Sequence, residues 1–245
     1  MALGRGNSGG GTFGTQNLSV AVDAGSQSNR FLEVDIVIYS SSDLYTSATY
    51  AGVAVDYVQK GQGVQNTGNY LYKLGFKAPA SGSNTLVVNF SSNPGGPSWG
   101  YQVYTDAHQT TQFDVQVQRN QASSTSFAPT LTTITNGCFI TLGYRMPSGN
   151  FTAGANTQLL SVGWAGAGSG DQIADTPTTQ TVGLQTLNIT TSGAASGWDG
   201  LLATILPVAA VGPTNVKTWD GLALASVKTV DGLAIASVKT INGLN

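Results

Sequence analysis

The chain has 245 residues, of which 40% are hydrophobic and only 9% are charged, and its formal net charge is −2. An average soluble domain has about 25% charged residues. The balance of 10 Lys and Arg against 12 Asp and Glu leaves no basic surface for DNA or RNA. The hydrophobic share excludes a disordered chain, and the single cysteine, Cys138, excludes an intrachain disulfide.

Residues 1–15 are rich in glycine, with Gly9-Gly10-Gly11 in the middle, and are expected to form a flexible arm. This segment lacks the apolar stretch of a signal peptide. No run of about 18 apolar residues, the length that crosses a membrane, occurs in the chain. The sequence therefore predicts a protein without membrane contact, made and assembled in the cytoplasm.

Residues 16–206 consist of short alternating strands separated by Gly, Asn, Ser and Pro turns, and they lack helical periodicity. The clearest strand runs from Phe31 to Tyr39. One of its faces is apolar, whereas Glu33 and Asp35 begin the other face, which is expected to meet solvent or a neighbour. The residues expected to be buried are Leu32, Val34, Ile36, Ile38, Leu86, Val88 and Phe90. About a dozen such strands predict one all-β domain, an antiparallel β-sandwich of jelly-roll kind.

Four segments of this region resemble, in order, the motifs of a family of sandwich domains found in phage and bacterial surface proteins. They are Ser28-Asn29-Arg30-Phe31-Leu32-Glu33-Val34, Thr49-Tyr50-Ala51-Gly52-Val53, Tyr70-Leu71-Tyr72-Lys73-Leu74, and Ala78-Pro79-Ala80-Ser81-Gly82 followed by Leu86-Val87-Val88. The resemblance covers residues 17–120 well and 121–206 loosely. The family usually has Gly-Gly where this chain has Ala51-Gly52, and the resemblance implies no catalytic residues.

Residues 207–215 read as a linker, and 216–245 repeat with a period of 11 residues. The repeats are Val216–Ser226, Val227–Ser237 and the shortened Val238–Asn245. An 11-residue period suits a right-handed helical coil, but a glycine in each repeat costs a helix about 1 kcal/mol. Asp-Gly and Asn-Gly between apolar residues favour β-hairpins instead.

Three such hairpins bury too little surface to be stable alone, so the tail is predicted to act in assembly between chains, together with the N-terminal arm, by adding strands to neighbouring sheets. The candidate interface residues are Val216, Trp219, Leu222, Leu224, Val227, Val230, Leu233, Ile235, Val238 and Ile241. The repeat also resembles C-terminal segments of phage virion proteins.

Residues able to carry catalysis are scarce, because His108 is the only histidine and Glu33 the only glutamate. His108 lies outside any nucleophile-elbow motif. Glu33 and Asp35 lie side by side on one strand, whereas glycosidase carboxyls flank the scissile bond. Asp171 and Asp175 lack the ligand spacing of a calcium loop. We therefore expect no catalytic residues, no metal site and no cofactor.

Trp99 and Tyr101 share one strand face beside a Pro-Gly loop and are the candidates for stacking on a sugar ring. Packing in the core is the ordinary role of aromatic residues in sheets. Both readings stay open from the sequence.

Together, the low charge, the tail and the resemblance imply a non-enzymatic structural protein of a bacteriophage particle. It would decorate the capsid or form part of the tail or fibre, and it would be made in the host cytoplasm and end in the virion. Its partners would be other virion proteins and copies of itself. The alternative is a carbohydrate-binding adhesin domain that recognises a host-surface glycan through Trp99 and Tyr101.

Overall fold

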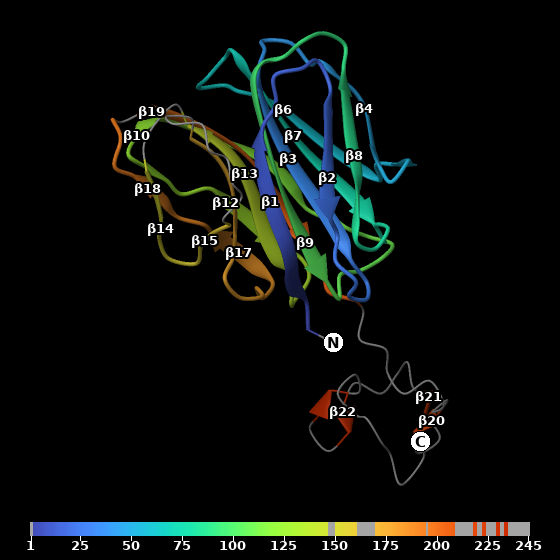
Figure 1. The fold of residues 1–245 in the computed structure, drawn as a ribbon. Helices are drawn as coiled ribbons and strands as arrows, with labels where there is room; N and C mark the ends of the chain where they lie inside the picture. Colours follow the sequence, from blue (N-terminus) through green and yellow to red (C-terminus); the bar gives the residue numbers. More distant parts are fainter. Residues whose placement is uncertain are drawn as a thin grey trace. The chain divides into compact units, whose positions relative to one another are not determined.

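The computed structural model describes residues 2–146, 150–160, 170–194 and 196–208, together with four two-residue strands between 218 and 234. These residues form antiparallel strands, and none of them is helical (Figure 1). Residues 2–207 are one compact unit, and residues 208–245 group with Met1 in a second unit. The all-β class predicted from the alternating pattern is confirmed.

Two sheets in the first half of the larger unit pack face to face. The central sheet has the order β1 (Gly4–Thr12), β9 (Gly95–Thr105), β3 (Phe31–Tyr39), β7 (Asn69–Lys77) and β6 (Tyr57–Gln62). The first outer sheet has the order β2 (Leu18–Asp23), β8 (Ser83–Phe90), β4 (Tyr45–Tyr50) and β5 (Val53–Ala54).

Three sheets form the second half. The facing sheet has the order β10 (Gln116–Ser124), β19 (Ser196–Ile205), β13 (Phe139–Met146), β16 (Gly170–Asp175) and β15 (Gln158–Leu159). A small sheet contains β11 (Ser126–Phe127), β18 (Ile189–Thr191) and β14 (Phe151–Ala153). A two-stranded sheet, here called the outer ribbon, contains β12 (Thr130–Thr133) and β17 (Gly183–Thr186).

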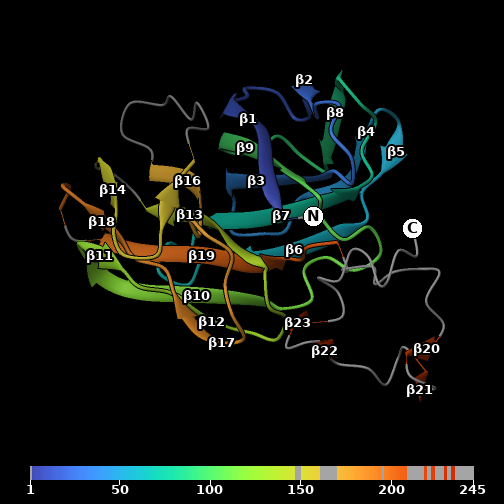
Figure 2. The ribbon, with the colours of Figure 1, turned by 90° about the horizontal axis from the view of Figure 1, so that it is seen from below.

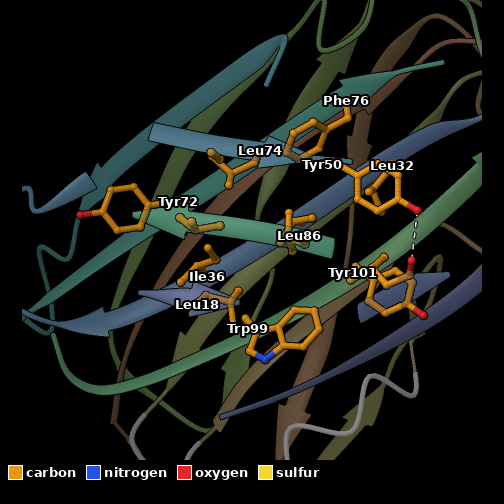
Figure 3. Packing of buried hydrophobic residues seen from close by; sticks show 14 of the residues in the cluster. Leu18, Leu32, Ile36, Tyr50, Tyr72, Leu74, Phe76, Leu86, Trp99 and Tyr101 are labelled. Atoms are coloured by element: carbon orange, nitrogen blue, oxygen red, sulfur yellow. Dashed lines mark hydrogen bonds between the residues drawn. The ribbon is translucent and has the colours of Figure 1, made fainter. Parts of the chain in front are cut away.

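The first apolar core lies between the central sheet and the first outer sheet (Figure 3). Every residue that the alternation assigned to the core is buried: Leu32, Val34, Ile36, Ile38, Leu86, Val88 and Phe90. A second apolar core, built around Trp198, lies between the facing sheet and the layers outside it. Period-2 patterning therefore identified correctly the apolar faces of β3 and β8 that form the first core.

The central sheet is covered on its second face as well, by the facing sheet (Figure 2). Phe31 of β3 packs in one cluster with Phe139 and Ile205, and Val37 packs in another with Ile173 and Leu201. The result is a stack of sandwich-like layers rather than two sheets alone.

This second covering overturns the expectation that Glu33 and Asp35 face solvent or a neighbouring molecule. Both residues are buried. Alternation shows that the two faces of a strand differ in polarity, but it does not show what covers the polar face.

The glycine-rich start of the chain also differs from expectation. Residues 4–12 form strand β1 at the edge of the central sheet, paired with β9, rather than a flexible arm. Gly9 lies opposite Tyr101 and Gly11 opposite Trp99. A Cβ on Gly9 would lie 2.7 Å from Cε1 of Tyr101. The glycines thus leave room for aromatic rings of the neighbouring strand, which cover the bare backbone.

The turn between β4 and β5 is a two-residue hairpin in which Tyr50 pairs with Val53. Ala51 and Gly52 have φ angles of 50° and 80°. Two positive φ angles are required by the type I′ turn, which matches the twist of antiparallel strands. Ala51 therefore holds a backbone conformation that glycine adopts more easily.

In the tail, the described residues form two short antiparallel pairs. β20 (Thr218–Trp219) pairs with β21 (Leu222–Ala223), and β22 (Thr229–Val230) pairs with β23 (Leu233–Ala234). The third copy of the repeat, residues 238–245, lies outside the described residues.

Candidate functional site

A cluster of buried charges lies where the central sheet meets the facing sheet. Asp35 of β3 is directly opposite Lys73 of β7 in the strand register. Nζ of Lys73 donates a hydrogen bond to Oδ2 of Asp35 at 3.1 Å and lies 2.8 Å from Oδ1, which is outside hydrogen-bonding geometry. Nζ also donates to Oε1 of Glu33. The side chains of Lys73 and Glu33 are fully buried, and that of Asp35 nearly so.

Strand β13 of the facing sheet closes the cluster. The Thr141 hydroxyl donates a hydrogen bond to Oε1 of Glu33 and accepts one from Nζ of Lys73 at 3.3 Å. Gly143 lies against the Asp35 carboxyl, and a Cβ there would be 2.6 Å from Cγ of Asp35. A side chain at position 143 would displace Asp35, so the glycine sets how closely the two sheets approach.

Burial governs the protonation of this cluster. It raises the pKa of Asp35 well above its usual value, although the Lys73 ammonium opposes the shift. Burial alone would lower the pKa of Lys73, but the carboxylates of Asp35 and Glu33 outweigh it and leave that pKa raised. Burial therefore favours the neutral amine and carboxylic acid, while the attraction between the opposite charges favours the ion pair.

A second ion pair lies at the start of the chain. Nε of Arg5 in β1 donates to Oδ2 of Asp175 at the end of β16, at 2.6 Å. The Arg5 guanidinium also lies 4.1 Å from the centroid of the Phe139 ring. Burial raises the pKa of Asp175 to about 6, although Arg5 opposes the shift. Asp175 was a candidate calcium ligand in the sequence, but here it pairs with an arginine.

Asp199 of β19 fixes the loop between β6 and β7 to the facing sheet. Its Oδ1 accepts hydrogen bonds from the backbone N–H groups of Val64 at 2.8 Å and Gln65 at 3.1 Å. Its Oδ2 accepts from the backbone N–H of Asn66 at 3.0 Å and from Nδ2 of the same residue at 2.9 Å. Hydrogen bonds to a charged acceptor are stronger than neutral ones. This buried carboxylate therefore links the β6–β7 loop of the first half to strand β19 of the second half.

The outer ribbon exposes an apolar strip. Ile134, Val182 and Leu184 are 62%, 54% and 69% exposed. Thr132 is opposite Leu184 in the register, Ile134 directly follows β12 and Val182 directly precedes β17. Because side chains alternate across a strand, Thr132 and Leu184 share the outer face, while Leu131 and Thr133 point inward and are buried. Neither strand carries a charged residue.

The two candidate sugar-stacking residues do not form an exposed platform. Trp99 and Tyr101 are only 6% and 8% exposed and belong to the first core (Figure 3). Their rings stack on each other, with centroids 6.0 Å apart and planes 12° apart. Sugar stacking needs exposed ring faces, so the packing reading is correct for this pair and the glycan-contact prediction is wrong.

His108 and Cys138, the other residues considered for chemistry, have structural surroundings. Nδ1 of His108 accepts hydrogen bonds from the backbone N–H groups of Thr110 and Thr111, at 3.2 and 3.0 Å, which stabilises a loop. Cys138 is fully buried, and burial raises the pKa of its thiol to about 11. A thiol with so high a pKa is a poor nucleophile. No cluster of metal-ligating side chains occurs among the described residues.

The predicted assembly residues are only partly described. Trp219, Leu222, Val230 and Leu233 lie in the four short strands of the tail. The others lie outside the described residues: Val216, Leu224, Val227, Ile235, Val238 and Ile241.

Comparison with known protein families, curated proteins and solved structures finds no match to this chain. Within the described residues, no helix is long and apolar enough to span a membrane.

Proposed function

We propose that the chain is a non-enzymatic structural protein of a bacteriophage particle, placed on the capsid or in the tail or fibre, which assembles through its C-terminal repeats. The observation that carries this proposal is the 11-residue repeat, each copy of which has Asp-Gly or Asn-Gly between apolar residues. Hairpins this short are not stable alone, and open strand edges pair readily with other chains. The layered sheets would supply the rigid body, and the tail would supply the contacts.

The surface chemistry of the larger unit supports self-assembly. With 9% charged residues, few charges must lose water when two copies meet. We propose that a second copy of the chain packs on the apolar strip of Ile134, Val182 and Leu184. Because the outer ribbon carries no charge, two copies of it would meet without repulsion.

The place where the larger unit ends supports the same surface. Pro207 forms a bridge with Ala107, and a Cβ on Gly137 would lie 3.5 Å from Cγ of Pro207. Gly137 is three residues from Ile134, a span of about 10 Å at most. Pro207, the last residue of the larger unit, therefore lies near the Ile134 end of the apolar strip.

The expectation that a free N-terminal arm binds neighbouring chains is not kept, because residues 4–12 already pair with β9 in the central sheet. The adhesin alternative has likewise lost the observation that motivated it, because Trp99 and Tyr101 are buried. The proposal rests on the tail and the apolar strip.

Removal of residues 212–245 tests the proposal. We expect the full chain to form a defined oligomer in size-exclusion chromatography with light scattering. The truncated chain should be a monomer with an unchanged thermal midpoint. A full-length variant with Gly221→Val, Gly232→Val and Gly243→Val is the matched control. It keeps the length of the tail but replaces the glycine of each Asp-Gly or Asn-Gly pair, on which the hairpins expected from the sequence depend, so it should also be monomeric.

Normal assembly of the truncated chain would contradict the proposal, as would its failure to fold. So would the absence of the chain from purified particles of the phage that encodes it.

A further inference from the structure

Lys73 and Asp35 bring an amine and a carboxyl together in a site without solvent contact. Both oxygens of Asp35 lie within 3.1 Å of Nζ of Lys73, so Cγ, which joins those oxygens, also faces the amine. Intramolecular reactions are fast when the reacting atoms are held about 3–3.5 Å apart, with effective concentrations of roughly 10⁵–10⁸ M. Glu33, in contact with the same nitrogen, is an available proton acceptor.

We propose that Lys73 and Asp35 form an intramolecular isopeptide bond, in which Nζ of Lys73 is joined to Cγ of Asp35 and one water molecule is released. The link would connect neighbouring strands β3 and β7 in the middle of the central sheet. This inference does not depend on the proposed function, because it rests on the buried cluster alone.

The reaction balances without any co-reactant. A proton passes from the Lys73 ammonium to Asp35, which leaves a neutral amine and a carboxylic acid. Burial favours these neutral forms and raises the pKa of Asp35, whereas the carboxylates of Asp35 and Glu33 raise the pKa of Lys73 and oppose the transfer. Nζ then attacks Cγ, and Glu33 takes the proton that the nitrogen loses. Glu33 returns that proton to the departing hydroxyl, which leaves as water, and its carboxylate is restored.

The surroundings select Asp35 rather than Glu33 as the acyl partner. Oε1 of Glu33 already accepts hydrogen bonds from Thr141 and Lys73, which suits a base held in place. Asp35 is directly opposite Lys73 in the register, and both of its carboxyl oxygens lie within 3.1 Å of Nζ. The Thr141 hydroxyl contacts both Glu33 and the reacting Nζ of Lys73, so it holds the base beside the amine.

The chain contains its own control for proximity alone. Nζ of Lys60 lies 2.7 Å from Oδ2 of Asp43, but both side chains are about one-third exposed. Water solvates the ion pair there, so the pair gains nothing from passing to the neutral amine and acid that the reaction needs. We expect no link between Lys60 and Asp43.

Peptide mapping of the full-length, denatured protein by mass spectrometry tests the proposal. Trypsin cannot cleave after an amide-linked lysine, so residues 31–60 should stay joined to residues 61–77, at the summed mass less one water. Fragmentation should place the link on Asp35 and not on Glu33. Mapping is needed because succinimide formation at Asp-Gly sequences, such as Asp199-Gly200, also releases water.

Two variants complete the test. Lys73→Arg keeps the cation but has no primary amine, so the two peptides should separate. Glu33→Gln keeps the shape but accepts no proton, so the linked peptide should fall at least tenfold. If either variant fails to fold, the wild-type map still decides the question.

A wild-type protein cleaved normally after Lys73 would overturn the proposal. A link from Lys73 to Glu33 would overturn the choice of Asp35, and an unchanged yield in Glu33→Gln would overturn the role of Glu33.

Discussion

Gly9 of β1 lies directly opposite Tyr101 of β9, and the tyrosine ring occupies the space that a side chain at position 9 would need. The pairing explains why a glycine-rich segment is a strand. The backbone of β1 gains hydrogen bonds from β9, and the rings of Trp99 and Tyr101 supply the contacts that glycine lacks.

We expect Gly9→Val to lower the free energy of unfolding by about 1–3 kcal/mol, because Tyr101 must move to admit the new side chain. Gly14→Ala is the matched control, since no heavy atom lies within 4 Å of a Cβ there. Chemical denaturation of both variants measures the difference. Equal stabilities would show that β1 does not need the close approach of Tyr101.

At the β4–β5 turn, we expect Ala51→Gly to stabilise the protein by about 1 kcal/mol, because Ala51 has a φ of 50°. Gly52→Ala should have the opposite effect, because residue 52 has a φ of 80°, and nothing lies within 4 Å of an added Cβ, so the cost comes from the backbone conformation alone. Thermal unfolding of the pair measures both signs. A destabilising Ala51→Gly would show that strain at this turn is negligible.

The protonation of Asp175 predicts a dependence of stability on pH. Burial raises its pKa from 3.8 to about 6, and the charge of Glu33 adds to the rise. Arg5 and the Tyr104 hydroxyl oppose it. Between pH 3.8 and about pH 6, the folded protein keeps the proton on Asp175, whereas the unfolded chain has lost it. The contribution of protonated Asp175 to the free energy of unfolding is therefore greatest at low pH and is lost above pH 6. The rise corresponds to about 3 kcal/mol.

Asp175→Asn tests this prediction, because asparagine stays neutral at every pH. The stability of the variant relative to wild type should increase between pH 4 and pH 7. Urea denaturation at several pH values measures it, and a relative stability independent of pH would be the contrary result.

On the outer ribbon, we expect Leu184→Asp to weaken self-association at least tenfold, about 1.4 kcal/mol. The thermal midpoint should be unchanged, because Leu184 is 69% exposed. Val53→Asp is the control, as Val53 is 67% exposed on β5, away from the ribbon. Sedimentation velocity distinguishes the two. If both variants associate like wild type, the strip is not a contact surface.

The sequence predicted the core of the first half well, because the even-numbered positions from Leu32 to Ile38 of β3 and from Leu86 to Phe90 of β8 are all apolar, and that face is buried. It failed for Glu33, Asp35 and Lys73. A polar face that meets solvent and one that meets another sheet have the same alternation. The one available signal was Lys73 itself, the only charge in the apolar run 70–76.

The aromatic and glycine-rich segments failed for a related reason. Glycine content predicts flexibility when a segment is considered alone, and exposed stacking of Trp99 and Tyr101 was plausible when that strand was considered alone. The structure of both segments depends on the pairing of β1 with β9, in which Gly9 lies opposite Tyr101. About 90 residues of sequence separate these two partners. Local patterns carry no information about such long-range pairing.

The two-sided covering of the central sheet has a consequence for modularity. A chain divided between β9 and β10 would leave the charges of Glu33, Asp35 and Lys73 bare on one piece, and the apolar side chains of Ala203 and Ile205 bare on the other. Neither half is expected to fold as an independent domain, although each has its own apolar core. Recombination or protein engineering that moves this body to another chain must therefore transfer residues 2–207 as a single block.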